Sequence, residues 1–274
     1  MHPYIRITRP VNSVMSGFAV FIAGIIAGGY PFTYKVILAS IVSIVACSGG
    51  MVINDYFDYD IDKINRKDRV LPRGEMNLKA AFFYAIFLLI LACFIAYFVN
   101  FKAFFICITA SILMFLYAYK LKRMCFVGNI LVGFLTSLTF LYGGAAVNKM
   151  EAVGMLFICS FLANISREIM KDIDDIKGDK EMGSSTLPII YGEKKSLLIS
   201  QIFLLSGMVT TFLPYVYNIF GVQYLFMISV LNIFVFWTLY ISKKNVSRAE
   251  KSLKIEMYGV LFVFFVSKII DQIA

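Results

Sequence analysis

Three aspartates with helical spacing follow the second apolar stretch of the chain. Asp55, Asp58 and Asp62 lie at positions i, i+3 and i+7, which places them on one face of an α-helix because successive residues turn by about 100°. Carboxylates in such a row repel one another unless a cation lies against them. Mg²⁺ takes oxygen ligands and often bridges carboxylates to the phosphates of a substrate. The row therefore predicts a magnesium site for a phosphate-bearing substrate, with Asp60, which falls off this face, as the weaker candidate.

The same spacing occurs a second time, at Asp172, Asp175 and Asp179. Six of the 17 acidic residues lie in 55–75 and seven in 168–193, so only four lie elsewhere. Two solvated loops between membrane helices would be the simplest alternative. Two acidic windows with matched spacing favour a pair of magnesium sites instead.

The composition predicts a membrane protein. The chain has 274 residues, of which 60% are hydrophobic and 16% charged, and its mean hydropathy is +0.79. These values lie far outside the range of soluble domains, and apolar runs of about 20 residues recur along the whole chain. We expect one polytopic all-α membrane domain over residues 1–274, with no separate soluble domain.

Nine membrane spans are expected, and they form a weak internal repeat. Spans 1–4 and 5–8 each carry an acidic window at the end of their second helix, and a ninth span follows. If the helices form a ring, the two windows line a central cavity that opens at one side of the membrane. The expected spans are 13–31, 36–54, 78–99, 101–119, 126–147, 151–170, 196–216, 221–242 and 255–273.

The basic residues predict the orientation of the chain. With the N-terminus in the cytoplasm, 22 of the 26 lysines and arginines fall on the cytoplasmic side, as the positive-inside rule requires. Both acidic windows then emerge in the cytoplasm. Because topology accounts for most of the net charge of +9, we infer no nucleic-acid partner, and no obligate protein partner is evident.

Other metal chemistry is disfavoured by the residue types. His2 is the only histidine and the five cysteines lie scattered in or beside apolar runs, so neither zinc catalysis nor a disulfide framework is expected. Basic side chains on the cytoplasmic side are candidates for direct phosphate contacts, although each could equally be a topology anchor. Arg69 stands out because its turn-rich segment, 68–74, could fold back over the site. The other candidates are Arg66, Arg73, Lys120, Lys122 and Lys171.

These motifs together resemble the UbiA superfamily of intramembrane prenyltransferases over essentially the full chain. Asn54-Asp55-x-x-Asp58-x-x-x-Asp62 and Asp172-x-x-Asp175-x-x-x-Asp179 match the two aspartate-rich motifs of that family. Residues 69–74 resemble the segment that follows its first motif, and Arg9-Pro10-x-Asn12 resembles its N-terminal signature. The resemblance implies that Asn12 and Asn54 line the site and that both rows bind Mg²⁺ against a prenyl diphosphate.

One motif departs from the family. The family often has Tyr-x-x-x-Lys after its fourth span, whereas here Tyr117 is followed by Leu121 at the lysine position, with Lys120 and Lys122 on either side. Both lysines remain candidates for the phosphate contact.

Several details resemble the archaeal branch of the superfamily, the digeranylgeranylglyceryl phosphate synthases. They are the segments 62–66, 167–172 and 178–188. This resemblance implies transfer of a geranylgeranyl group from geranylgeranyl diphosphate to the free hydroxyl of geranylgeranylglyceryl phosphate in the lipid bilayer. The first and second rows would each hold one Mg²⁺, and either an aspartate or the released diphosphate would take the hydroxyl proton.

Three other classes of protein are alternatives to this lipid prenyltransferase. An aromatic-acceptor prenyltransferase of quinone synthesis stays open, because the donor chemistry is shared and the acceptor pocket has no readable code. A cation transporter predicts ionisable residues deep inside several spans, whereas these acids lie at span ends. The CDP-alcohol phosphotransferases carry an Asp-Gly-x-x-Ala-Arg pattern that is absent from this sequence.

Overall fold

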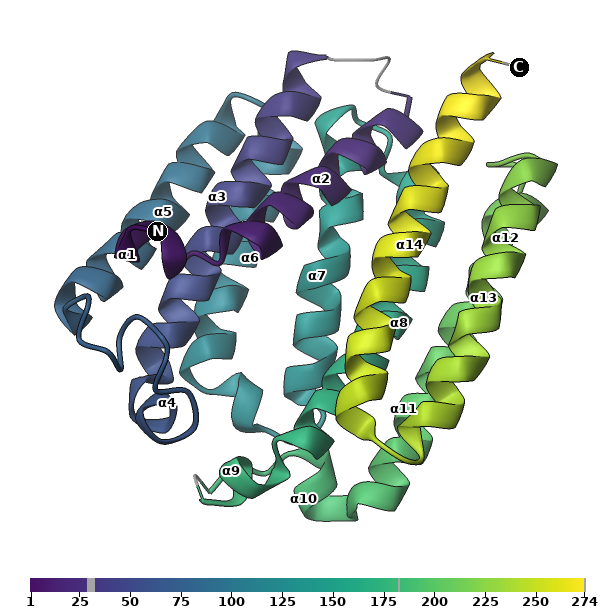
Figure 1. Ribbon diagram of the computed structural model, residues 1–274. Coiled ribbons are helices and arrows are strands. Elements are labelled where there is room, and N and C mark those ends of the chain that lie inside the picture. Colours follow the sequence, from purple (N-terminus) through teal and green to yellow (C-terminus); the bar gives the residue numbers. More distant parts are fainter. Residues whose placement is uncertain (29–32, 182, 274) are drawn as a thin grey trace. The chain divides into compact units, whose positions relative to one another are not determined.

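The structure is a computed structural model that describes residues 1–28, 33–181 and 183–273. Within these residues every regular element is a helix (Figure 1), so the all-α prediction is confirmed. The helices are α1 (Pro3–Arg6), α2 (Pro10–Ile26), α3 (Tyr34–Phe57), α4 (Tyr59–Asn65), α5 (Leu78–Tyr97), α6 (Phe101–Tyr119), η1 (Leu121–Arg123), α7 (Val127–Ala146), η2 (Met150–Val153), α8 (Gly154–Asp174), α9 (Ile176–Glu181), α10 (Leu187–Tyr191), α11 (Glu193–Thr210), α12 (Leu213–Val216), α13 (Val222–Ser242) and α14 (Val246–Ile273).

Seven helical segments in the described residues are long and apolar enough to cross a membrane, so the chain is a multi-pass membrane protein. The predicted count of nine is not confirmed. The first expected span forms α2, an apolar helix of only 17 residues, and the last residues of that expected span, 29–31, lie outside the described residues. The ninth lies in α14, where Glu256, Lys268 and Asp271 interrupt the apolar run. The seven segments are α3, α5, α6, α7, η2 with α8, α11 with α12, and α13.

The chain folds as two compact units, and helix α7 belongs partly to each. Unit 1 comprises Met1–Lys122 and Leu141–Met150, and unit 2 comprises Arg123–Phe140 and Glu151–Ala274. Helix α7 therefore contributes its first part to unit 2 and its last turns to unit 1. The single domain, the internal repeat and the ring around a central cavity all stay predictions.

Unit 1 is built around α3, which packs against α2, α5 and α6. The approach of α7 to α2 in this unit requires a glycine, because a Cβ at Gly143 would lie only 2.4 Å from the carbonyl oxygen of Val20. A separate core near the end of α3 joins Ile7 from the N-terminal segment to Val70, Leu71 and Met76 from the loop after α4. This core fixes the loop that follows the first aspartate row.

Unit 2 is built around α8, which packs against α11 and α14, while α13 packs along α14. The last turns of α8 are held by apolar contacts, since Ile165, Ile169 and Ile173 pack with Leu187 of α10. The second aspartate row therefore begins on a helix whose other face is firmly packed.

Candidate functional site

The first aspartate row crosses a break between two helices. Helix α3 ends at Phe57, and Asp58 has φ −92° and ψ 2°, the bridge conformation in which many active-site residues lie. The amide of Asp58 still donates to the carbonyl of Asn54 at 3.0 Å, and that of Asp62 donates to the carbonyl of Asp58 at 2.8 Å. The prediction of one continuous helix is wrong at Asp58, but the turn-to-turn spacing of the row is preserved.

The second row has the same local geometry in unit 2. Helix α8 ends at Asp174, and Asp175 has φ −91° and ψ 4° before α9 begins. Its amide donates to the carbonyl of Lys171 at 2.9 Å, and the amide of Asp179 donates to the carbonyl of Asp175 at 3.1 Å. In both rows the middle aspartate occupies the break, a correspondence that the sequence spacing alone did not reveal.

Three basic side chains form ion pairs with the first row. Arg9 and Arg69 both pair with Asp55, the latter at 3.3 Å, and Arg69 also pairs with Asp62. Asp55 and Asp62 are only 5% and 4% exposed, so these ion pairs lie in a largely desolvated place. Burial raises the pKa of Asp62, while the guanidinium of Arg69 opposes that rise.

Lys122 is the lysine that reaches the row. Its Nζ lies 2.5 Å from Oδ1 of Asp58 and donates to Oδ1 of Asn54 at 3.2 Å. Asn54 in turn donates from Nδ2 to Oδ2 of Asp58 at 2.8 Å. Lys120 is exposed, whereas Tyr117 lies half-buried on α6. The structure thus distinguishes the two lysines that the sequence left equivalent.

The loop after α4 delivers Arg69 because it is fastened at several points. Val70 and Leu71 are each only 3% exposed and belong to the core described above. Glu75 then binds Arg6 of α1 and lies 2.8 Å from Nε of Arg73. The predicted return of segment 68–74 to the aspartate row is confirmed by the pairing of Arg69 with Asp62. Arg66, another candidate for a phosphate contact, is exposed.

Arg9 was not among the predicted site residues, although it belongs to the N-terminal signature. It precedes α2 in the left-handed conformation with φ 49°, which is uncommon for a residue other than glycine. This turn places its guanidinium against Asp55. Asn12, the predicted residue of that signature, lies half-buried on α2.

The second row has a different set of neighbours. Asp172 accepts a hydrogen bond of 2.6 Å from Asn129 at the start of α7. One turn earlier, Glu168 is 6% exposed and pairs with Lys171 at 3.2 Å and with Arg167 at 3.1 Å. Asp175 is exposed and Asp179 half-buried. Asn129 was missed because a single asparagine in an apolar run carries no recognisable pattern.

The donor atoms of the two rows fit a hard divalent cation. Each row offers three carboxylates, and Asn54 and Asn129 add amides, a set that suits Mg²⁺ better than a softer metal. In the part of the chain that the structure describes, no three acidic, cysteine or histidine side chains converge closely enough to hold a metal. In the first row the carboxylates contact Arg9, Arg69 and Lys122 instead.

Comparisons with known proteins identify the family of this chain. Residues 15–268 match the UbiA prenyltransferase family. The digeranylgeranylglyceryl phosphate synthase of Thermococcus kodakarensis is 39% identical over 272 residues, covering 97% of this chain and 98% of that protein. The one from Thermococcus sibiricus is 42% identical over 272 residues, with 97% of each chain covered. The chain therefore belongs to the UbiA prenyltransferase family, as its motifs predict.

Two solved structures have a similar fold. A structure of digeranylgeranylglyceryl phosphate synthase in membranes has a TM-score of 0.82 and 35% identity, and covers 97% of this chain and 98% of its own. A UbiA homologue from Archaeoglobus fulgidus, bound to DMAPP and Mg²⁺, has a TM-score of 0.69 over 96% of this chain and 99% of its own. At 16% identity the second likeness shows the fold alone.

Proposed function

We propose that this protein transfers a geranylgeranyl group from geranylgeranyl diphosphate to the free hydroxyl of geranylgeranylglyceryl phosphate, a step of archaeal ether-lipid synthesis. The observation that carries the proposal is the convergence of Arg9, Arg69 and Lys122 on the first aspartate row. Carboxylates with closely held cationic groups suit a diphosphate, and the full-length relatives named above support the particular donor and acceptor.

The basic side chains bind and orient the diphosphate. Arg69 offers a planar fork of donors that matches phosphate oxygens, whereas Lys122 acts as a compact point charge. Both side chains are partly buried, with 17% and 12% exposed, and in such a place charge–charge attraction is stronger than in water. Their fixed positions reduce the reorganisation needed when negative charge develops on the leaving group.

The aspartates would hold the metal ions. Asp55, Asp58 and Asp62 would serve one Mg²⁺ in unit 1, and the second row, Asp172, Asp175 and Asp179, would serve another in unit 2. Magnesium, when bound, neutralises charge on the diphosphate oxygens. Asn54 and Asn129 orient carboxylates of the two rows by hydrogen bonds of 2.8 Å and 2.6 Å, and such support of ligating carboxylates usually affects metal affinity.

The transfer step breaks the bond between the allylic carbon and the diphosphate oxygen. The acceptor hydroxyl oxygen forms the new ether bond to that carbon, and its proton passes to an aspartate of the rows or to the released diphosphate. Lys171, which is held by Glu168 at 3.2 Å, would add positive charge beside the second row.

We further propose that the N-terminus and both rows face the cytoplasm in a nine-span protein. The distribution of 22 of 26 basic residues on that side supports this orientation.

A transfer assay with purified protein tests the proposed reaction. Labelled geranylgeranyl diphosphate is supplied with Mg²⁺ or with EDTA, and geranylgeranylglyceryl phosphate and 4-hydroxybenzoate are offered separately as acceptors. Magnesium-dependent product with the glyceryl phosphate alone is expected. Product with the aromatic acid alone would replace the acceptor but keep the class of enzyme, and no product with either would overturn the proposal.

A further inference from the structure

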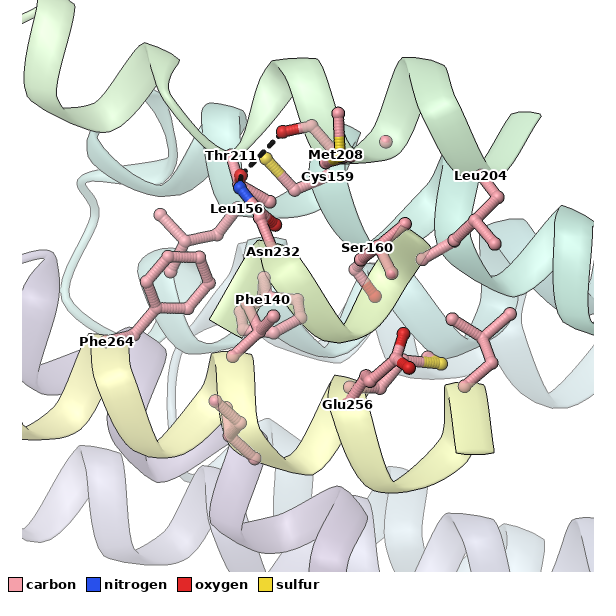
Figure 2. A pocket seen from close by; sticks show the side chains of 17 residues that line it. Phe140, Leu156, Cys159, Ser160, Leu204, Met208, Thr211, Asn232, Glu256 and Phe264 are labelled. Carbon is pink, nitrogen blue, oxygen red and sulfur yellow. Dashed lines mark hydrogen bonds between the residues drawn. The ribbon is translucent and has the colours of Figure 1, made fainter. Parts of the chain in front are cut away.

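Unit 2 contains a cavity that the aspartate rows do not account for. It measures about 80 Å³ and lies among α8, α11, α13 and α14, with Phe140 of α7 at its side (Figure 2). Most of its lining is aliphatic or aromatic, including Leu156, Leu204, Val260 and Phe264. Among the described residues that line it there is no lysine, arginine or histidine. The cavity is apolar but small, with room for only the first few carbons of a hydrocarbon chain.

One charged side chain lies within this apolar lining. Glu256 of α14 is only 6% exposed, and Figure 2 shows its carboxyl group pointing from the helix into the cavity. Its Oε1 accepts hydrogen bonds from Thr238 and, at 3.2 Å, from Ser252. Its Oε2 is buried and has no hydrogen-bond partner among the residues that the structure describes. An acceptor buried without a partner costs free energy, so a donor is required at this position.

A hydroxyl from α8 points toward the same space. Figure 2 shows Ser160 and Glu256 directed toward each other across the cavity. The Oγ of Ser160 accepts hydrogen bonds from Ser137 and from Nδ2 of Asn164, each at 3.1 Å. With both acceptor positions used, its own hydrogen is left to donate. The polar end of the cavity therefore combines an acceptor, Glu256 Oε2, with a donor, Ser160 O–H.

We propose that this cavity binds the hydroxyl end of a long-chain alcohol. A hydroxyl is both donor and acceptor, so it donates to Glu256 and accepts from Ser160, while the first carbons of its chain occupy the apolar part of the cavity. An ammonium group only donates and would leave Ser160 without an acceptor. A phosphate or diphosphate is excluded by charge, because the described residues that line the cavity include a carboxylate, Glu256, and no cationic side chain.

This site is separate from the proposed reaction centre and does not depend on the proposed function. None of the six row aspartates lines the cavity. Ser160 precedes Asp172 by twelve residues on α8, which is about 18 Å along a helix axis. Within unit 2, the site would therefore hold the hydroxyl of a neutral lipid alcohol away from Asp172.

The test uses photolabelling of the full-length protein in detergent. The probe is a farnesol analogue that carries a diazirine, and labelled peptides are identified by mass spectrometry. Label is expected on the segments of α8 and α11 that contain Ser160 and Met208, which line the cavity. Unlabelled farnesol should compete about three to ten times better than farnesyl methyl ether, which cannot donate to Glu256.

Glu256→Gln makes the test specific. The amide keeps the acceptor that faces Thr238 and Ser252 but turns the other position into a donor, so the methyl ether should then compete as well as farnesol. Asp271→Asn is the control, because Asp271 lies on the same helix and pairs with Gln223. It should keep the preference for the alcohol.

Three results would overturn the proposal. The first is label only outside the cavity, which would leave water as the partner of Glu256. The second is equal competition by the alcohol and the ether in the unmodified protein, and the third is a preference for the alcohol that Glu256→Gln leaves unchanged. A thermal unfolding midpoint of Glu256→Gln in detergent close to that of the unmodified protein confirms that the variant is folded.

Discussion

Replacement of Lys122 by methionine should strongly weaken use of the prenyl diphosphate. Methionine keeps a long apolar stem but removes the ammonium group, which lies 2.5 Å from Asp58 and 3.2 Å from Asn54. A hydrogen bond to a charged group contributes about 1.5–3 kcal/mol. At about 1.4 kcal/mol for each factor of ten, kcat/KM for the donor should fall about ten- to hundredfold.

Lys120→Met provides a matched control. Lys120 is two residues away in the same connection but is exposed, so its loss should change kcat/KM by less than about twofold, as expected for a surface charge. Initial rates are measured at saturating Mg²⁺ and acceptor while the donor concentration is varied. If Lys120→Met lost as much activity as Lys122→Met, or if Lys122→Met were fully active, the assignment of Lys122 to the diphosphate would be refuted.

Three further changes test other parts of the structure. Arg69→Ala should raise KM for the donor by about tenfold or more, because the side chain joins two carboxylates of the first row; an unchanged KM would make it a topology anchor. Asn129→Ala should raise the Mg²⁺ concentration needed for half-maximal transfer about tenfold or more by freeing Asp172, and an unaltered magnesium titration would contradict this. Gly143→Ala should destabilise the protein by about 1–3 kcal/mol, because its Cβ would lie 2.4 Å from a backbone oxygen of α2. Thermal unfolding in detergent compares it with Gly154→Ala, where a Cβ meets nothing within 4 Å, and equal midpoints would refute the close helix contact.

The sequence carried enough information for the class of protein and for the carboxylates. Long apolar runs predict membrane helices because lipid leaves few alternatives for the backbone, and the i, i+3, i+7 spacing identifies Asp55, Asp58 and Asp62 as a row. The family resemblance rests on the same residues. These features are local, so they can be read without knowledge of the fold.

The partners of the carboxylates could not be predicted in the same way. Arg9 and Lys122 reach the first row from positions 46 and 64 residues away from their carboxylates, and only folding decides which basic residue arrives. Lys120 and Lys122 carry the same charge in the same predicted loop, so the sequence left them equivalent until their exposure was known. The break at Asp58 was also missed, because helical spacing continues across it and the backbone hydrogen bonds persist.

The predicted number of nine spans stays unconfirmed. Hydropathy predicts a span at every long apolar run, but α2 has only 17 residues and α14 contains a buried acid, Glu256. A glutamate within an apolar run reads as an interruption, yet in the structure it is held by Thr238 and Ser252. Such side-chain hydrogen bonds are not visible in a hydropathy pattern.

The central claim is that both aspartate rows serve one magnesium-dependent prenyl transfer. The most direct measurement compares transfer rates of Asp58→Asn and Asp175→Asn with those of Asp60→Asn and Asp174→Asn. The last two alter exposed carboxylates beside the rows and act as controls for charge. We predict a loss of at least about a thousandfold for each row variant, the scale of a lost transition-state interaction of about 4 kcal/mol, and nearly full activity for both controls. Full activity of either row variant, or an equal loss in its control, would contradict the claim.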